Sequence, residues 1–302
     1  MRRTHIDIGI CTFQRASIFA TLDSIASQSL PEGVSLSVIV ADNDDTDRQK
    51  TAIEAHAAAK GLATRYIHAP SRNISLARNA CLDAVSGAAL VFIDDDESAD
   101  AHWIRNILAS WRESGAGVVF GPAVAIYPPA APDWMRRNDF HSNRPTTRAG
   151  RVETGNTSNV LLDLSDPRVA SCRFDPSYGR TGGEDVDFFF RLHRAGVHMA
   201  ICETATVREP VAPSRLSFGW VVRRRNMQGA IYGSCIAQHK PEMRWRTLSA
   251  SAAKAAFCLV RVPPTLLGFG DAHFWIMRAA FHAGVASGCL TQPRREVYGG
   301  TG

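Results

Sequence analysis

The chain has 302 residues, of which 45% are hydrophobic and 21% are charged, a composition typical of a folded globular protein with room for one large domain and an appendage. The formal net charge of +5 is unevenly spread, because acidic residues gather in the first two thirds and arginines recur from Arg223 onward. This asymmetry indicates an anionic partner or surface. No apolar run reaches the eighteen or so residues that a membrane-spanning helix needs.

The seven cysteines form no Cys-x-x-Cys pair. Their odd number and wide spacing disfavour a disulfide framework or a thiolate zinc site and fit a reducing cytoplasm. Met1, Arg2 and Arg3 are typical of the start of an export signal, but Asp7 interrupts the apolar run that such a signal requires. We therefore expect no signal peptide and a cytoplasmic protein.

Strands and helices alternate over the first third of the chain. Ile6, Ile8 and Ile10 recur with the period of a strand, which runs into residues 11–15. The same reasoning predicts a helix from Ile18 that ends before Pro31, a strand over 36–40, a helix over 46–60, a strand over 64–68, a helix over 75–85 and a strand over 88–93. This order predicts an α/β protein with a mostly parallel, doubly wound sheet, whose ligands bind beyond the carboxyl ends of the strands.

The strand over 88–93 ends in four consecutive acids, Asp94, Asp95, Asp96 and Glu97. Adjacent carboxylates repel one another unless a cation or a donor-rich partner compensates them, and hard oxygen ligands suit Mg²⁺ or Mn²⁺. The competing interpretation is a solvated acidic loop that caps the next helix. Thr12 and Asp42 end the first two strands, so we expect all these groups at one edge of the sheet.

The middle of the chain is less regular. Trp103 and Trp111 lie on a helical apolar stripe and are expected in the core, and residues 118–121 are expected to form a further strand. From residue 127 to residue 150 the chain is rich in proline, asparagine and arginine without periodicity. We expect this segment to be a mobile loop over the site.

Two glycines precede Glu184 and Asp185 at the start of an expected helix. Backbone amides and the helix dipole favour an ionised carboxylate there, which is suited to act as a base, although ordinary N-capping by acids is an alternative. A later helix, over 214–232, carries Arg223, Arg224 and Arg225. One or two of these arginines are suited to clamp a diphosphate, and the others are expected at the surface.

The last part, residues 245–290, is rich in alanine and carries aromatic residues interrupted by Lys254, Arg261, Asp271 and Arg278. Apolar helix faces with tryptophan and phenylalanine beside arginine suit helices that lie in a membrane interface. The alternative is a helical subdomain that packs on the main sheet or on a second subunit.

The order of several motifs resembles that of family 2 glycosyltransferases with the GT-A fold, a Rossmann-like doubly wound sheet. The resemblance covers about the first 230 residues. The motifs that carry it are Cys11-Thr12-Phe13-Gln14-Arg15, Val40-Ala41-Asp42-Asn43, Ser75-Leu76-Ala77-Arg78-Asn79, Phe92-Ile93-Asp94-Asp95-Asp96, Gly155-Asn156, Phe174-Asp175 and Gly182-Gly183-Glu184-Asp185. Residues 207–215, the tail and Val297-Tyr298-Gly299 are similar to bacterial exopolysaccharide transferases of the succinoglycan type.

The resemblance implies roles for individual residues. It makes Thr12 and Asp42 contacts to the base and ribose and Arg78 a contact to the nucleotide side of the donor. The other expected nucleotide-sugar contacts are Asp94, Asp95, Arg15 and, as the diphosphate clamp inferred above, Arg224. Asp94 to Asp96 take the place of the family's DXD element, with Asp96, Asp94 and Glu209 as ligands of a divalent cation, Mn²⁺ or Mg²⁺. Many relatives carry histidine where this chain has Glu209, so either Glu209 is a ligand or the acidic cluster holds the metal alone. Asp185 takes the place of the catalytic base, with Glu184 beside it.

We therefore expect an inverting, metal-dependent hexosyltransferase that moves a sugar, glucose from UDP-glucose by preference, to a lipid-linked oligosaccharide in exopolysaccharide or cell-surface glycan biosynthesis. Residues 1–235 are expected to form the transferase domain, with a nucleotide half over 1–121 and an acceptor half over 122–235. Residues 236–302 are expected to form a helical tail that holds the protein on the inner face of the cell membrane. No nucleic acid partner is expected.

Two other functions compete with this one. A sugar nucleotidyltransferase also places acids at the ends of parallel strands, but it needs a glycine-rich loop after the first strand, and residues 9–15 contain a single glycine. A non-catalytic sugar-nucleotide-binding subunit of a polysaccharide assembly complex is the third possibility, and the acids retained at both sites argue against it.

Overall fold

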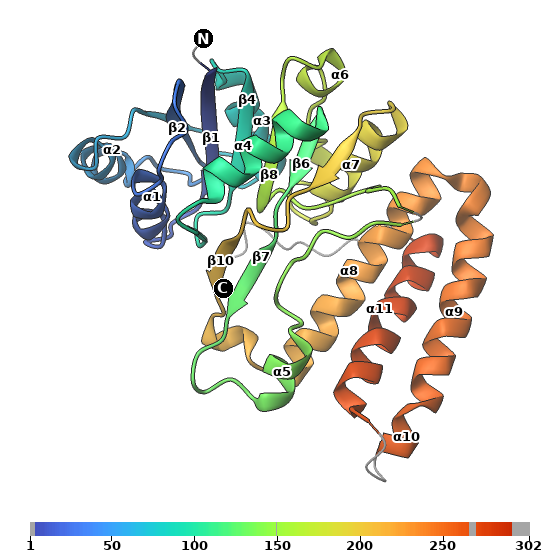
Figure 1. The fold of residues 1–302 in the computed structure, drawn as a ribbon. Coiled ribbons are helices and arrows are strands. Elements are labelled where there is room, and N and C mark those ends of the chain that lie inside the picture. Colours follow the sequence, from blue (N-terminus) through green and yellow to red (C-terminus); the bar gives the residue numbers. More distant parts are fainter. Residues whose placement is uncertain (1–3, 149, 266–269, 292–302) are drawn as a thin grey trace. The chain divides into compact units, whose positions relative to one another are not determined.

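The computed structural model describes residues 4–148, 150–265 and 270–291 (Figure 1). The chain divides into two compact units. Of the described residues, those within 4–126 and 142–210 form the first unit, and those within 127–141 and 211–291 form the second. These units differ from the expected division at residue 235, because residues 211–235 group with the helical tail.

A mixed sheet of seven strands in the order β3-β2-β1-β4-β8-β6-β9 forms the centre of the first unit. Every neighbouring pair is parallel except β4 with β8 and β6 with β8, so the expected mostly parallel sheet is confirmed. The strands are β1 (Thr4–Thr12), β2 (Val34–Asp42), β3 (Thr64–His68), β4 (Ala89–Ile93), β6 (Val118–Phe120), β8 (Asn159–Asp163) and β9 (Met199–Ile201). A separate small sheet has the order β5-β10-β7 and consists of β5 (Ser98–Ala99), β7 (Ala123–Ile126) and β10 (Val207–Pro210).

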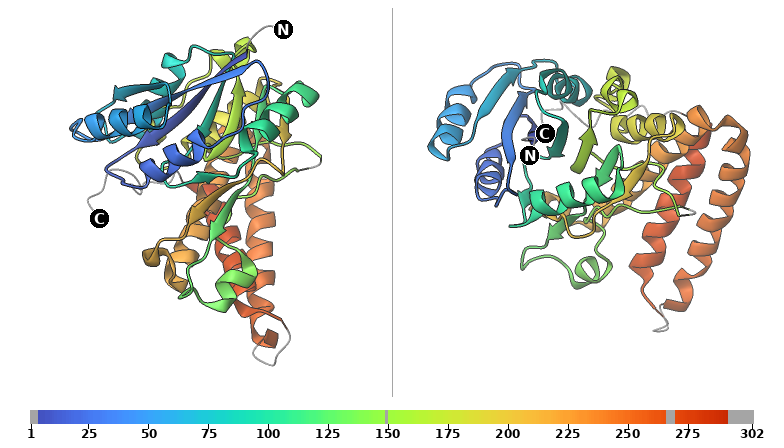
Figure 2. Two further views of the ribbon diagram at one scale, coloured as in Figure 1. Left: turned by 60° about the vertical axis from the view of Figure 1, so that its left-hand side comes forward. Right: turned by 45° about the horizontal axis from the view of Figure 1, so that its top comes forward.

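Helices cover both faces of the large sheet (Figures 1 and 2). One buried cluster joins the strands to α1 (Ile18–Ala26), α2 (Lys50–Ala59) and α4 (Trp103–Ser114). The other joins them to α3 (Ile74–Ala84), α6 (Pro167–Ala170) and α7 (Glu184–Arg194), and a short 3₁₀ turn spans Pro176–Tyr178. The sheet is therefore doubly wound, as expected.

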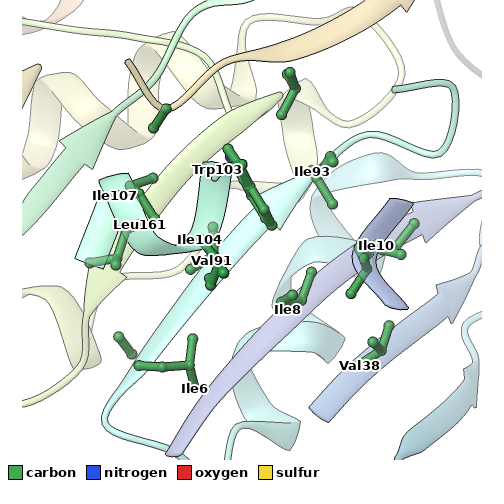
Figure 3. Packing of buried hydrophobic residues seen from close by; sticks show 14 of the residues in the cluster. Ile6, Ile8, Ile10, Val38, Val91, Ile93, Trp103, Ile104, Ile107 and Leu161 are labelled. Atoms are coloured by element: carbon green, nitrogen blue, oxygen red, sulfur yellow. The ribbon is translucent and has the colours of Figure 1, made fainter. Parts of the chain in front are cut away.

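The core follows from the alternation of side chains along the strands. Ile6, Ile8 and Ile10 of β1 point to the α1 and α4 side, where Trp103 is fully buried (Figure 3). On the other side Gly9 makes room for a neighbour, because a Cβ atom at Gly9 would lie 3.0 Å from the ring of Phe92. The expected core position of Trp103 is confirmed.

The second unit is helical. Its elements are α5 (Asp133–Asn138), α8 (Phe218–His239), α9 (Arg244–Val260), α10 (Val262–Thr265) and α11 (Ala272–Leu290), with 3₁₀ turns at Pro213–Arg215 and Pro241–Met243. Within this unit α11 lies between α8 and α9 (Figure 1). None of the described helices combines the length and apolarity that crossing a membrane requires.

Some local expectations were wrong, and hydrogen bonds of single side chains explain why. The helix expected from residue 46 begins only at Lys50, because the carboxylate of Asp44 binds the backbone amide of Asp45 at 2.8 Å and the Arg48 guanidinium at 3.0 Å in a preceding turn. The helix expected from residue 214 begins at Phe218, where the Ser217 hydroxyl caps it.

The expectation that residues 127–150 lack regular structure was also wrong, since α5 forms within them. The Asn138 side-chain amide donates a hydrogen bond to Asp271 at 2.8 Å, and Trp134 stacks on His273 with ring centroids 4.5 Å apart. These contacts fix α5 within the helical unit. Val297, Tyr298 and Gly299, which contributed to the family resemblance, lie outside the described residues.

Candidate active site

The carboxyl ends of β1, β2 and β4 bring three predicted site positions together. Thr12 and Asp42 are register partners at the ends of β1 and β2. β4 is the other neighbour of β1, and Asp94 follows its last residue. In a parallel sheet these three ends share one edge, which is where ligands bind in doubly wound folds. The structure therefore confirms that these side chains share an edge.

Arg15 lies on the acidic cluster. Its guanidinium donates a hydrogen bond to Asp95 at 3.0 Å and also forms an ion pair with Asp96. The Thr12 hydroxyl donates a further hydrogen bond to Asp95 at 2.8 Å. Thr12 and Arg15, both predicted to contact the nucleotide-sugar donor, thus bind the aspartates of the acidic cluster.

Uncompensated negative charge remains around Asp94. Burial raises the pKa of Asp94 to about 7, against the opposing effect of the Arg78 charge, and the carboxylates of Asp96, Asp95 and Glu209 add to the rise. Glu97 behaves similarly: burial and Asp94 raise its pKa, and its Oε1 atom is buried without a hydrogen-bond partner. A site of this kind gains free energy when a cation enters.

The chemistry of these groups fits a hard divalent cation, because all the candidate ligands are carboxylates. Within residues 4–148, 150–265 and 270–291, however, no three His, Cys, Asp or Glu side chains are gathered as a metal site requires. Asp96 faces Arg15, and Glu209 lies on β10 in the small sheet. The predicted ligands therefore offer oxygen atoms that suit such a cation, and they act electrostatically on Asp94. That they converge on one ion stays a prediction.

The end of β2 carries Asp42, which is fully buried in a set of hydrogen bonds. Its carboxylate accepts a hydrogen bond from the Tyr66 hydroxyl at 2.7 Å and one from the backbone amide of Asp44 at 3.0 Å. The pKa of Tyr66 is raised by burial and by this bond, so Tyr66 remains a donor. Sequence analysis missed Tyr66. Its position in β3, next to the strand end that carries Asp42, was the signal for it.

The motif around Arg78 holds a distant segment of the chain. The Asn79 side chain donates to the carbonyl of Phe174 and accepts from its amide, both at 2.8 Å. The Ser75 hydroxyl donates to the carbonyl of Asp175 at 2.8 Å, and the Asn73 amide donates to the carbonyl of Pro176 at 2.9 Å. Three polar side chains of one helix and its cap thus fix the segment that leads into the glycine pair before α7.

That glycine pair places Glu184 and Asp185 at the first turn of α7. Gly182 and Gly183 have φ angles of 77° and 96°, in the left-handed region that glycine tolerates best. Glu184 is buried, whereas Asp185 is half-buried and accepts a hydrogen bond from the Val186 amide at 2.7 Å. Of the two carboxylates, Asp185 is the one exposed enough to meet a substrate.

Arg78 and Glu184 form a buried ion pair, with relative exposures of 6% and 1%. The Arg78 guanidinium also lies over the Phe174 ring, 5.6 Å from its centroid. Burial raises the pKa of Glu184 to about 7, although the Arg78 charge opposes this rise. Arg78 lowers the pKa of Asp94 as well, so one guanidinium is shared electrostatically by the acidic cluster and the start of α7.

Comparison with known proteins identifies the family. The sequence model of "Glycosyl transferase family 2" matches residues 7–163. The chain is also 39% identical over 297 residues to the succinoglycan biosynthesis protein ExoM of Rhizobium meliloti (strain 1021), covering 98% of this chain and 96% of that protein. The chain belongs to glycosyltransferase family 2. This family 2 enzyme is therefore a glycosyltransferase, and the sheet edge described above is its candidate active site.

Solved structures share its fold at low sequence identity. The mannosyltransferase PcManGT from Pyrobaculum calidifontis, in complex with GDP-Man and Mn²⁺, matches with a TM-score of 0.63 at 16% identity, over 96% of this chain and 88% of its own. S. aureus TarS 1-349 in complex with UDP-GlcNAc matches with a TM-score of 0.55 at 14% identity, over 95% and 90%. This chain spans 55% of a longer TarS chain. The expected GT-A fold is thus confirmed.

Proposed function

We propose that this glycosyltransferase transfers a hexose from a nucleoside diphosphate donor to a saccharide acceptor with inversion of the anomeric centre, and that Asp185 is the catalytic base. The observation that carries the proposal is the placement of Asp185 at the start of α7, beside a buried pair, Arg78 and Glu184, whose arginine also acts on the acidic strand end. Arg78 thereby links the acidic strand end, where the donor is proposed to bind, to the start of α7, where the proposed base lies.

Asp185 has what a base in this reaction requires. A carboxylate in the first turn of a helix is stabilised in its ionised form by the helix dipole, so Asp185 is ready to accept the proton of an acceptor hydroxyl. As the hydroxyl oxygen forms its bond to the anomeric carbon, the bond to the diphosphate breaks on the opposite face. Glu184 is too buried to take part directly, and we assign it a positioning role through Arg78.

The leaving diphosphate needs positive charge. Asp94, Asp96 and Glu209 are the residues that would hold Mn²⁺ or Mg²⁺, and such an ion would neutralise the charge that grows on the leaving group. Arg15 already contacts Asp95 and Asp96, so binding of an ion and a diphosphate there would require this guanidinium to change partners. Arg224 is a second candidate contact. It lies on α8 in the other compact unit, so its role stays a prediction.

The nucleoside is assigned to the end of β2, where Asp42 lies. Asp42 is the predicted contact to a base or ribose. The Tyr66 hydroxyl donates to Asp42, which leaves its oxygen able to accept a hydrogen bond from a ligand, and Thr12 lies in register with Asp42. A uridine nucleotide is the expected donor and UDP-glucose the first to test. One structural neighbour is in complex with UDP-GlcNAc and another with GDP-Man, so both nucleotides belong in the test.

A lipid-linked oligosaccharide in exopolysaccharide synthesis is the proposed acceptor, at the cytoplasmic face of the cell membrane. The support is the similarity to a succinoglycan biosynthesis protein over nearly the whole chain, together with the basic and aromatic character of the helical unit. A lipid-linked acceptor requires the enzyme to work at the membrane surface.

A panel of UDP- and GDP-sugars tests the proposed reaction. Each donor is incubated with Mn²⁺ or Mg²⁺, with and without a lipid extract that contains the acceptor, and the released nucleotide is measured. Release of nucleoside diphosphate that depends on the lipid extract supports transfer. Pyrophosphate formed from a nucleoside triphosphate would instead identify a nucleotidyltransferase. Nucleotide-sugar binding without any release would identify a non-catalytic binding subunit.

A further inference from the structure

The outward face of α9 is unusually apolar for a helix that meets water. Residues 245, 249, 252, 256 and 260 recur at intervals of three and four, which places them on one face, and all are exposed. Among the described residues of the helical unit, the large apolar side chains with the highest relative exposures lie on this face and its margins, at 65% for Trp245, 59% for Phe257, 57% for Leu259 and 72% for Val260. Among the exposed residues of α9, only Arg246 and Lys254 are charged.

This face is not the one that holds the helical unit together. The buried residues of α9 are Ser251 and Cys258, on the opposite side of the helix. α11 is the main neighbour of α9 and is itself packed tightly on α8, since a Cβ atom at Gly284 or Gly288 would lie 2.0 Å from a backbone oxygen of α8. The inner face of α9 therefore packs within its own unit. On the outer side, the Phe257 ring meets Trp275 of α11 edge-on, with ring centroids 6.0 Å apart, while Trp245, Leu259 and Val260 remain largely exposed.

The charged side chains of α9 itself are all cationic. From Met243 to Gly270 the sequence contains no aspartate or glutamate, whereas Arg244, Arg246, Lys254 and Arg261 are all cationic. Arg244 lies over the Trp245 ring at 5.1 Å. A symmetric contact between two copies of this face would bring cations against cations. An anionic partner with an apolar interior satisfies both the charge and the exposed side chains.

We propose that the outward face of α9 docks on an anionic lipid bilayer, with Trp245, Phe257, Leu259 and Val260 inserted below the headgroups and Arg246 and Lys254 at the level of the phosphates. An amphipathic helix of this kind lies in the plane of the membrane interface, and lysine and arginine side chains extend along its edge to the headgroups. The inference deepens the proposed function, since it states how the enzyme would meet a lipid-linked acceptor.

Vesicle co-sedimentation of the full chain tests this proposal. Phosphatidylcholine vesicles are compared with vesicles of equal parts phosphatidylcholine and phosphatidylglycerol, and we expect strong binding only to the second kind. Each cation near an anionic surface contributes roughly fivefold to binding, so Arg246→Glu with Lys254→Glu should weaken binding at least about 30-fold. The control pair Arg105→Glu and Arg112→Glu on α4 carries the same charge change at exposed positions and should weaken binding far less.

The apolar contribution is tested separately. Phe257→Gln with Val260→Gln should lower binding roughly tenfold or more, because two exposed apolar side chains can no longer be buried in the bilayer. Leu30→Gln, at an exposed position of the other unit, is the matched control and should bind like the unchanged protein. All these positions are exposed, so the variants should fold, which circular dichroism checks.

Three results would overturn the proposal: equal binding of the unchanged protein to both kinds of vesicle, variants of α9 that bind like the unchanged protein, or a dimer in light scattering that the α9 variants convert to a monomer while no vesicle binding is seen. Failure of the proposed transferase function has a different signature. In that case vesicle binding would persist while no nucleoside diphosphate is released with any donor.

Discussion

Replacing Arg78 by methionine should make the stability of the first unit depend on pH in a way that the unchanged protein does not. Removing one partner of a buried ion pair costs about 3–5 kcal/mol in folding stability when the remaining group stays charged. Glu184 can instead take up a proton, since its pKa is already raised to about 7 and loss of the opposing Arg78 charge raises it further. At low pH the variant therefore keeps Glu184 protonated and loses less stability.

The sign follows from linkage. A carboxyl group whose pKa is higher in the folded state stabilises the fold fully below its unfolded pKa, and this contribution is lost as the pH rises through the folded value. In the unchanged protein the stabilising contribution of protonated Glu184 is lost by about pH 7. In Arg78→Met, where the pKa of Glu184 is higher, this contribution continues to fall above that pH. The gap between the two proteins should thus widen by up to about 1.4 kcal/mol per pH unit above about pH 7.

Hydrogen exchange of residues 188–192 in α7, corrected for the intrinsic exchange rates and followed at several pH values from about 6 to 8.5, measures the opening free energy that changes. We expect a widening of about 2 kcal/mol over that range for Arg78→Met. The double variant Arg78→Met with Glu184→Gln lacks the titration of Glu184 and should show a smaller widening, which comes from Asp94, because Arg78 also lowers the pKa of Asp94. A constant gap in Arg78→Met, or an equal widening in the double variant, would refute the assigned role of the pair.

Asn79→Ala removes both hydrogen bonds to Phe174, so protease cleavage near residue 174 should accelerate and the free energy of unfolding in urea should fall by about 1–3 kcal/mol. Unchanged cleavage would show that Asn79 does not hold this segment. Gly233→Ala would place a Cβ atom 2.2 Å from the Val285 carbonyl oxygen and should destabilise the helical unit by at least about 1–3 kcal/mol. The control Gly219→Ala in the same helix should be neutral or stabilising. A thermal unfolding measurement that finds Gly219→Ala the less stable of the two would contradict the packing. Burial lowers the pKa of His141, so the helical unit should lose stability as the pH falls below about 6.5, and His141→Gln should flatten that profile in urea unfolding at two pH values.

The parts of the fold that sequence analysis predicted correctly are those with local signals. The alternation of Ile6, Ile8 and Ile10 marks β1 without any knowledge of its neighbours, and acidic residues after strand ends mark the ligand edge of a parallel sheet. The antiparallel β8 between β4 and β6 had no comparable signal, because pairing is decided by contacts far apart in sequence. The late start of α2 depends on hydrogen bonds of Asp44 that compete with the helix.

At the candidate site, too, contacts between residues far apart in the sequence could not be predicted from local patterns. Arg78 was predicted to contact the nucleotide-sugar donor. The structure pairs it with Glu184, which is 106 residues away in the sequence, and no local sequence pattern near either residue predicts this pair. Asn79 was quoted only as part of a motif, whereas the structure shows it clamping Phe174 from another part of the fold. Family resemblance indicated residues that the structure places at one edge of the sheet and at the start of α7, and their roles stay a prediction. The physical reason for several of them became visible only when the distant segments were placed side by side.

Asp185→Asn is the most direct test of the central claim. The substitution keeps the size of the side chain and removes its basicity, and Asp83→Asn at an exposed position of α3 is the matched control. With the donor and lipid extract that support turnover, we expect Asp185→Asn to bind the nucleotide sugar like the unchanged protein in calorimetry while release of nucleoside diphosphate falls by roughly 10²–10⁴-fold. Turnover within a few fold of the control would contradict the assignment of the base, and with it the proposed mechanism.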